Sequence, residues 1–378
     1  MRRRRPEPST VRVVRLAVPL AAIFAALGLV SCSTAASAAR ASGKSATPSY
    51  APHVQRFVPT RPQVVADRAA PALRHDAEFV PVSVLATRFG LRFAWTDPDH
   101  RRFVLQNRAQ RLEFEVDSRE CEICGLRVFL GDGVRLEGGV PGLSRTDMDL
   151  LVIPILRPGY GGPRLHSVHT IVLDAGHGGR DTGTVNTHLH LMEKTLTLDT
   201  VMRIKRLLLA AGYRVVLTRT SDRYVGLAER PEVAERCHAD LFISIHFNSV
   251  VGGAGAVTGV ETFTMTPQGQ LSTNQAVDQY VNVFNPGNAN NYWNTVLGAS
   301  LHRAVLGELR TPDRGLKRGR LAVLRLAQCP AALIESGYLS NDTEARRLAQ
   351  PEYRERIAHA IVAGIKAYAA DIEAVRRR

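Results

Sequence analysis

The C-terminal half of the chain alternates short apolar runs with longer segments of helical spacing. The apolar runs, each predicted to form a strand, lie at 170–173, 213–218, 240–245, 260–264, 321–324 and 331–335. Helical spacing covers 191–211, with Leu198, Met202, Lys205 and Leu209 along one side, then 227–237, and finally 344–370 with a break near Pro351. Strands that alternate with helices predict an α/β fold over residues 166–372, a three-layer sandwich around a mostly parallel sheet.

A different pattern precedes this region. Over residues 61–160, a short helix-like stretch opens at Val80 and ends near Gly90. Short alternating stretches then follow at 91–95, 103–105, 112–116 and 128–130, with Asp-Pro-Asp at 97–99 and Gly-Asp-Gly at 131–133 as turn signals. This pattern predicts a small, mostly β N-terminal domain.

The N-terminus has the charge and hydropathy pattern of an export signal. Arginines at positions 2–5 precede an apolar run over 16–30, which is shorter than a membrane-spanning helix. Leu29-Val30-Ser31-Cys32 resembles the lipobox of bacterial lipoproteins, which implies a signal peptide over 1–32 and a lipid on Cys32. Ordinary cleavage after Ala38 is the alternative. Residues 33–60, rich in Ser, Ala, Thr and Pro, predict a flexible tether. We therefore expect export to the cell envelope, as a periplasmic protein or a membrane-anchored lipoprotein.

The net charge and the cysteines indicate which partners and which kinds of cysteine pairing to expect. The net charge of +14 favours a polyanionic partner such as anionic lipid or an acidic wall polymer. The basic residues are dispersed and form no RNA-binding or zinc-finger pattern, so nucleic acid is not an expected partner. Cys121 and Cys124 either close a tight disulfide loop or stay unpaired, and Cys237 and Cys329 are expected to be buried as small apolar residues.

Three residues of the kinds that bind metals lie at or near the ends or beginnings of predicted strands and helices. His177 comes shortly after the strand at 170–173, Glu193 begins a helix, and His246 ends a strand. Two imidazole nitrogens and a carboxylate make an open catalytic zinc site, with a fourth position for water or substrate. Glu335 ends another apolar strand, where a carboxylate needs either an ion-pair or hydrogen-bond partner or a catalytic role. Beside zinc, that catalytic role is the role of a general base. The wide gaps between these positions mean that only the fold can bring them together.

Each of these residues also has a structural alternative. His177 could be a turn residue, Glu193 a charge at a helix N-terminus, His246 a core histidine, and Glu335 a buried salt-bridge partner. The rival metal pair His188 and His190 is interpreted as solvated loop residues. Asp174 is expected to orient a histidine or a loop, and Arg230 to pack or pair near the cleft. The aromatic residues that could line a sugar or peptide groove, or pack in the core, are Tyr224, Tyr292 and Trp293.

Six motifs carry a family resemblance over about two hundred residues. They are DAGHGGRDTG, EKTLTLD, VVLTRTSDRYVGLAER, ADLFISIHFNS, GVETF and ALIESGYLSN. In this order they resemble the zinc-dependent N-acetylmuramoyl-L-alanine amidases, the third amidase family. The resemblance implies an α/β sandwich, zinc ligands at His177, Glu193 and His246, and a catalytic glutamate at Glu335.

The chain departs from the family pattern at several places. Ala175 stands where proline is usual, Glu235 where asparagine is common, and residues 184–186 replace a small Gly/Ala stretch. Residues 266–296 suggest an insertion or a rebuilt rim. Some relatives carry a helix that covers the zinc until a partner protein removes it. The sequence leaves autoinhibition and a regulatory partner open.

The N-terminal domain has a looser resemblance. Residues 79–156 follow the order of the copper amine oxidase N-terminal-like domain, with Cys121 and Cys124 where a small polar turn is usual. That resemblance implies targeting or wall attachment. The expected activity is hydrolysis of the amide between muramic acid and L-alanine in peptidoglycan. The alternatives are a zinc peptidase that cuts inside the stem peptide and a non-catalytic wall-binding lipoprotein.

Overall fold

The computed structural model describes residues 78–377 apart from 251–253, 274 and 276–280. The predicted signal peptide, Cys32 and the tether lie outside the described residues. Among the helices of the described part, none combines the length and the apolar character that crossing a membrane requires.

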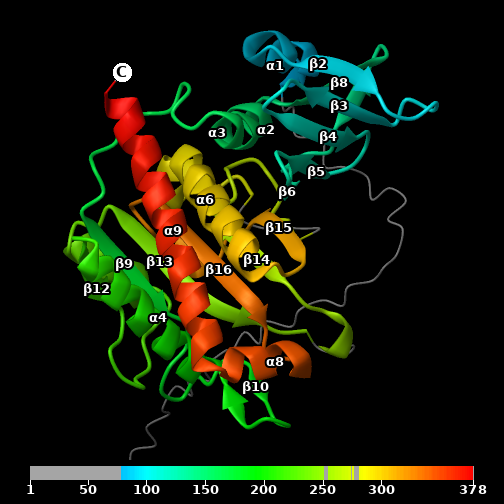
Figure 1. Cartoon of the computed structure of the whole chain (residues 1–378). Helices are drawn as coiled ribbons and strands as arrows, with labels where there is room; N and C mark the ends of the chain where they lie inside the picture. The colour runs from blue at the N-terminus through cyan, green and yellow to red at the C-terminus, as the bar shows by residue number, and fades with distance from the viewer. Residues whose placement is uncertain (1–77, 251–253, 274, 276–280, 378) are drawn as a thin grey trace, which may run out of the picture. The chain divides into compact units, whose positions relative to one another are not determined.

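A single sheet of eleven strands contains the apolar runs of both halves of the chain (Figure 1). In spatial order the strands are β12 (Arg214–Leu217), β9 (Thr170–Ala175), β13 (Leu241–Asn248), β16 (Ala331–Tyr338), β14 (Val260–Thr264), β15 (Asp313–Arg318), β6 (Leu126–Phe129), β5 (Glu120–Ile123), β4 (Arg111–Glu115), β3 (Arg102–Gln106) and β2 (Arg92–Trp95). Strands β12, β9, β13 and β16 are parallel, β14 runs antiparallel to β16 and parallel to β15, and β2 to β6 are antiparallel.

Helices contact the mostly parallel part of this sheet from two sides. One core contains Ile171, Ile243 and Ile334 together with the buried faces of α4 (Glu193–Ala210), α6 (Asn291–Leu309) and α9 (Pro351–Arg376). A second core contains Val172, Phe242 and Leu333, which alternate with the first set along the strands, together with residues of α5 (Glu229–Arg236) and α7 (Ala322–Arg325). Covered strands lose the polar alternation of exposed ones, which explains the continuous apolar runs. The prediction of a mixed α/β fold around a mostly parallel sheet is confirmed.

The C-terminal helical region also agrees with the prediction, since α8 (Asp342–Ala349) ends just before Pro351 begins α9. One detail was wrong. The run 321–324, predicted as a strand, lies at helix α7 (Ala322–Arg325), which is too short for periodicity to distinguish from a strand. The helix expected over 191–211 is α4, in which Met202 and Leu209 are 44% and 49% exposed and the buried stripe contains Val201, Ile204 and Leu208.

The segment interpreted as an insertion leads into a central helix. Residues 286–290 form a 3-10 turn, η3 (Pro286–Asn290), whose Asn285 and Asn288 cap each other's backbone. Helix α6 follows and is buried on most of its surface, packing against α9 and β14. A helix that is apolar nearly all round has no amphipathic stripe, so its pattern gave no helical signal.

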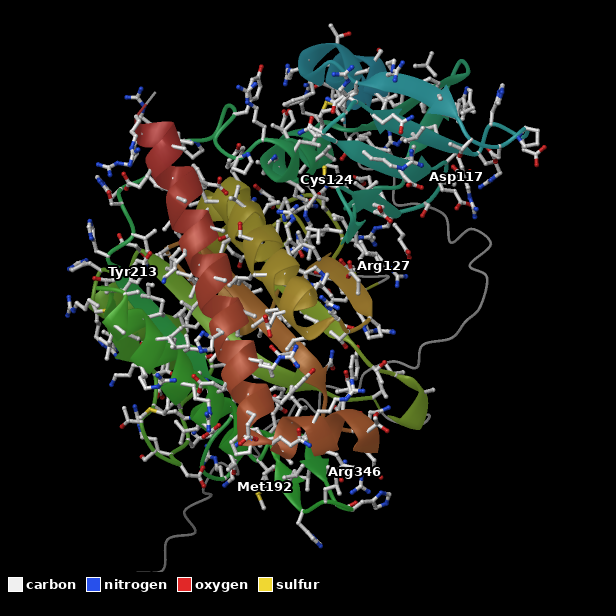
Figure 2. The ribbon with its side chains drawn as sticks, viewed as in Figure 1. Asp117, Cys124, Arg127, Met192, Tyr213 and Arg346 are labelled. Carbon is white, nitrogen blue, oxygen red and sulfur yellow. The ribbon has the colours of Figure 1, made fainter. Side chains whose placement is uncertain are left out.

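The N-terminal region joins the large sheet at β6. A second sheet of three strands holds β1 (Phe79–Pro81), β8 (Val140–Ser144) and β7 (Arg135–Glu137), beside α1 (Val82–Phe89), α2 (Arg145–Asp147), η1 (Met148–Val152) and α3 (Ile153–Leu156). Strand β6 pairs with β15 where Val128 meets Leu316, and Figure 2 shows Arg127 at this junction. Beside it, Arg318 and Asp147 form a buried ion pair at 2.8 Å.

The four described cysteines are unpaired. Cys121 is buried and Cys124 is half-buried in the β5–β6 hairpin, with no disulfide between them. Cys237 and Cys329 are half-buried rather than fully buried as expected, and they pack against the core that α5 and α7 cover.

Candidate metal centre

Three side chains from separate elements meet beyond the carboxyl ends of the parallel strands. His177 follows β9 by two residues, His246 lies near the end of β13, and Glu193 is the first residue of α4. One possible ligand atom from each lies within 4.8 Å of the others. The crevice beyond the carboxyl ends of strands is where open α/β sheets bind ligands. The structure therefore brings the three expected residues together.

The carboxylate of Glu193 is at the centre of this cluster. Its Oε1 lies 2.9 Å from His246 Nδ1 and 3.2 Å from His177 Nε2. Tetrahedral zinc with bonds of about 2.0–2.1 Å holds its ligand atoms roughly 3.3 Å apart, so the spacing and the donor types fit zinc. Backbone N–H groups of Phe247 and Thr184 donate to Oε1 and Oε2 at 3.1 and 2.9 Å. Burial opposes ionisation, but the contacts with the two histidines outweigh it and hold the pKa of Glu193 well below its usual range.

Asp181 orients His177 from the opposite side. Its Oδ2 lies 2.9 Å from His177 Nδ1, which directs Nε2 toward Glu193. A carboxylate that binds the second ring nitrogen fixes the tautomer of a metal-ligating histidine. Burial opposes the charged imidazole, but Asp181 and Glu193 together raise the pKa of His177 to about 10. Asp181 was not among the predicted site residues, although the sequence places its carboxylate four positions after the histidine.

Two buried arginines hold the backbone around His177, which has a φ of +59° that is uncommon for a residue with a side chain. Arg230 donates to the carbonyl oxygens of His177 and Ala175 at 2.9 and 2.8 Å and pairs with Asp174 at 2.8 Å. Arg219 donates to the carbonyl of Gly176 at 2.9 Å. The carboxylate of Asp174 contacts Thr218, Ser244 and Arg230. Asp174 therefore supports the loop through Arg230, and none of these contacts is to a histidine.

Glu335 lies one strand away from His246 in the same row of the sheet. On β16 it is the register partner of His246 on β13 and of Glu261 on β14. Its Oε2 is buried, with no hydrogen-bond partner among the described residues. Burial raises the pKa of Glu335 well above its usual range, and the negative charges of Glu193 and Glu261 add to the effect. A carboxylate that readily carries a proton beside a metal-binding cluster suits general acid–base chemistry.

The other candidates lie elsewhere. His188 and His190 are exposed in the turn between β10 (Val185–Asn186) and β11 (Leu191–Met192), where His188 contacts Asp342 at 3.0 Å. Tyr292 and Trp293 are core residues, only 7% and 1% exposed. Of the three aromatic candidates, only Tyr224 is exposed, at 44%.

Comparisons with known proteins cover the same part of the chain. Residues 171–367 match the family model described as N-acetylmuramoyl-L-alanine amidase. The uncharacterised protein YqiI of Bacillus subtilis is 32% identical over 200 residues, which cover 53% of this chain and 84% of YqiI. The N-acetylmuramoyl-L-alanine amidase LytC of the same organism is 30% identical over 199 residues, but this chain covers only 35% of LytC.

One solved structure is the catalytic domain of CwlV, an N-acetylmuramoyl-L-alanine amidase from Bacillus (Paenibacillus) polymyxa var. colistinus. It is 30% identical, covers 53% of this chain and 98% of its own, and has a TM-score of 0.44. The family model spans more than half of the 378 residues and includes all four candidate site residues. The chain therefore belongs to the N-acetylmuramoyl-L-alanine amidase family.

Proposed function

We propose that this protein is a zinc-dependent amidase that hydrolyses the amide between muramic acid and L-alanine in peptidoglycan. The observation that carries the proposal is the cluster of His177, Glu193 and His246 with Glu335 in the same row of the sheet. Membership of the amidase family supports the choice of bond. The donor set supports zinc, because two imidazoles and a carboxylate leave one tetrahedral position open.

His177 Nε2, Glu193 and His246 would hold the metal. Bound there, zinc would supply Lewis-acid polarisation of the scissile carbonyl and of the attacking water. Asp181 keeps His177 Nε2 directed at Glu193, and the amides of Phe247 and Thr184 keep the Glu193 carboxylate in place. Glu335 takes a proton from the attacking water on a carboxylate oxygen and delivers it to the L-alanine nitrogen as the C–N bond breaks.

The setting of this reaction is also part of the proposal. Relatives from Staphylococcus are named probable cell wall amidases, which supports a role in the cell envelope. Export through residues 1–32, anchoring through a lipid on Cys32, and wall attachment through residues 61–160 stay predictions. A cell fractionation of the full chain and of Cys32→Ala separates anchoring from simple secretion.

The substitution Glu335→Gln tests the proposed chemistry. It preserves size and polarity but cannot accept a proton, so turnover of peptidoglycan should fall by about 10²–10⁴-fold. Zinc content and the circular dichroism spectrum should stay as in the wild type, because the three ligands are unchanged. Glu137→Gln, on the exposed strand β7, is the matched control and should keep full turnover. Near wild-type turnover of Glu335→Gln contradicts the role of base, and loss of zinc in step with activity makes Glu335 a ligand instead.

A further inference from the structure

A tight turn separates His177 from the carboxylate that orients it. Gly178 and Asp181 close the turn with two backbone hydrogen bonds of 2.8 and 3.2 Å. Arg180 is exposed in this turn, directly before Asp181. Since both ends of the turn are fixed by the contact between His177 and Asp181, Arg180 is anchored at the rim of the candidate metal centre.

The side chain of Arg180 lies on an exposed aromatic ring. Its guanidinium carbon is 4.2 Å from the centroid of the Tyr224 ring. The two loops are in close backbone contact, because a Cβ on Gly179 would lie 2.6 Å from the amide nitrogen of Tyr224. A guanidinium that stacks on a ring is held by its face, while the N–H groups at its edge point outward and can bind a carboxylate with two parallel hydrogen bonds.

The charge of Arg180 is not neutralised by its neighbours. Asp181 is engaged by His177, and Asp222 is engaged by Lys194 Nζ at 2.6 Å and by the amide of Gly179 at 2.7 Å. No carboxylate of the described residues forms an ion pair with Arg180. The rim therefore presents one oriented and uncompensated cation beside the candidate centre.

We propose that Arg180, positioned by Tyr224, binds a carboxylate of the stem peptide and so determines which stem peptides are preferred. The inference rests on the proposed amidase function. In the stem, L-alanine is followed by D-glutamate linked through its γ-carboxyl group, so a free α-carboxylate lies one residue beyond the scissile amide. In walls that carry D-isoglutamine, a neutral carboxamide replaces this group. Arg180 is suited to the charged form, because ionised partners strengthen a bidentate hydrogen bond.

Titration calorimetry with two stem tripeptides tests the inference on the zinc-loaded full chain. The peptides are L-Ala-γ-D-Glu-L-Lys and the same peptide with the α-carboxylate converted to a carboxamide. We expect the wild type to bind the carboxylate form about five- to tenfold more tightly, a modest ratio because the site is solvated. Arg180→Gln should bind both peptides equally, at the affinity that the wild type shows for the carboxamide.

Three variants sharpen the result. Tyr224→Phe retains the ring and should keep the preference, whereas Tyr224→Ala should lose most of it. Arg88→Gln is the matched control, since Arg88 is also exposed and lies over a tyrosine ring, that of Tyr160 at 5.8 Å, in α1. It should bind both peptides as the wild type does.

Equal affinity of the wild type for the two peptides, or a preference that persists in Arg180→Gln, would overturn the inference. Failure of the amidase proposal would give a different result, namely no cleavage of a muramyl peptide. The preference for one peptide over the other can still be measured in that case, because calorimetry measures binding and not cleavage. Cleavage of the two corresponding muramyl tripeptides, one with the α-carboxylate and one with the carboxamide, at the same kcat/KM would refute the role of Arg180 alone and leave the amidase reaction intact.

Discussion

At position 183, a side chain would collide with two of the candidate ligands. A Cβ on Gly183 would lie 2.5 Å from His177 Cδ2 and 2.6 Å from Glu193 Oε2, and the φ of +63° adds strain. The glycine thus leaves room for the ligand cluster itself.

Gly183→Ala is therefore expected to lower zinc affinity while the protein stays folded. Displacing His177 or Glu193 weakens a three-ligand site strongly, because the remaining pair cannot complete the tetrahedral shell. Gly212→Ala is the matched control: it has a φ of +88° at the end of α4 but open space around the new Cβ. Zinc content after dialysis against a weak chelator measures the difference. Equal retention of zinc by both variants would show that the contact at 183 is unimportant.

Asp313 shows how one carboxylate connects three elements. Its Oδ1 contacts His302 Nε2 of α6 at 2.8 Å, and its Oδ2 accepts the backbone N–H of Arg127 in β6 at 2.9 Å. Burial favours the neutral acid, but the bond to His302 outweighs it and lowers the pKa of Asp313 below its usual value of 3.8. A carboxylate whose pKa falls on folding stabilises the protein above the unfolded pKa and loses that effect as pH falls through the folded one.

The lowered pKa of Asp313 predicts how the stability of the variant Asp313→Asn, compared with that of the wild type, changes with pH. The free energy of unfolding of the wild type should exceed that of the variant at neutral pH. The difference should shrink once the pH drops below about 4, where the unfolded carboxylate takes up its proton. Urea unfolding at several pH values, followed by circular dichroism, measures it. A difference that is constant with pH would mean that Asp313 contributes through shape rather than charge.

At the level of strands and helices, the buried ion pair of Arg318 with Asp147 lies at the junction between β6 and β15. Arg318 and Asp147 are 2% and 0% exposed, and Asp147 also accepts the backbone N–H groups of Gly131 and Asp132. Gln270, from the segment after β14, accepts a bond from Arg318 at 2.6 Å. The pair thus connects α2, β15 and the segment after β14.

Removing one partner of this pair should be costly. Asp147→Asn leaves the buried guanidinium of Arg318 without its counter-charge, which costs about 3–5 kcal/mol in comparable buried pairs. The control is Glu120→Gln, which breaks the exposed pair with Arg127 in the neighbouring hairpin and should cost about 1 kcal/mol or less. Denaturant unfolding of both variants measures the two costs. Equal costs would mean that the buried pair is not a major support of the junction.

The hydrophobic pattern predicted some strands and helices and missed others, because it registers only elements whose burial leaves a regular alternation or a bounded apolar run. Strands β9, β13 and β16 were predictable because each contains an apolar run bounded by polar residues. Helix α6 was not, because burial on most sides removes the amphipathic stripe. The meeting of β6 with β15 joins Val128 to Leu316, and no local pattern encodes a pairing between residues so far apart in the chain.

At the scale of the whole molecule, the candidate site was more predictable than the sheet that holds it. The grouping of His177, Glu193 and His246 agrees with the prediction because each lies at the end or start of a recognisable element. Asp181 and Arg180 were missed, since their roles depend on a turn that only the folded backbone closes. The roles of the four candidate residues stay proposals until chemistry is measured.

Mass spectrometry of the products that the zinc-loaded full chain releases from purified peptidoglycan in heavy-oxygen water tests the proposed amidase reaction most directly. We expect free L-alanine amino termini, one heavy oxygen in the lactyl carboxylate of muramic acid, and intact glycan and stem peptides. Cleavage should stop after chelation and return when zinc is added. New amino termini inside the stem peptide, or undiminished cleavage by the metal-stripped protein, would contradict it.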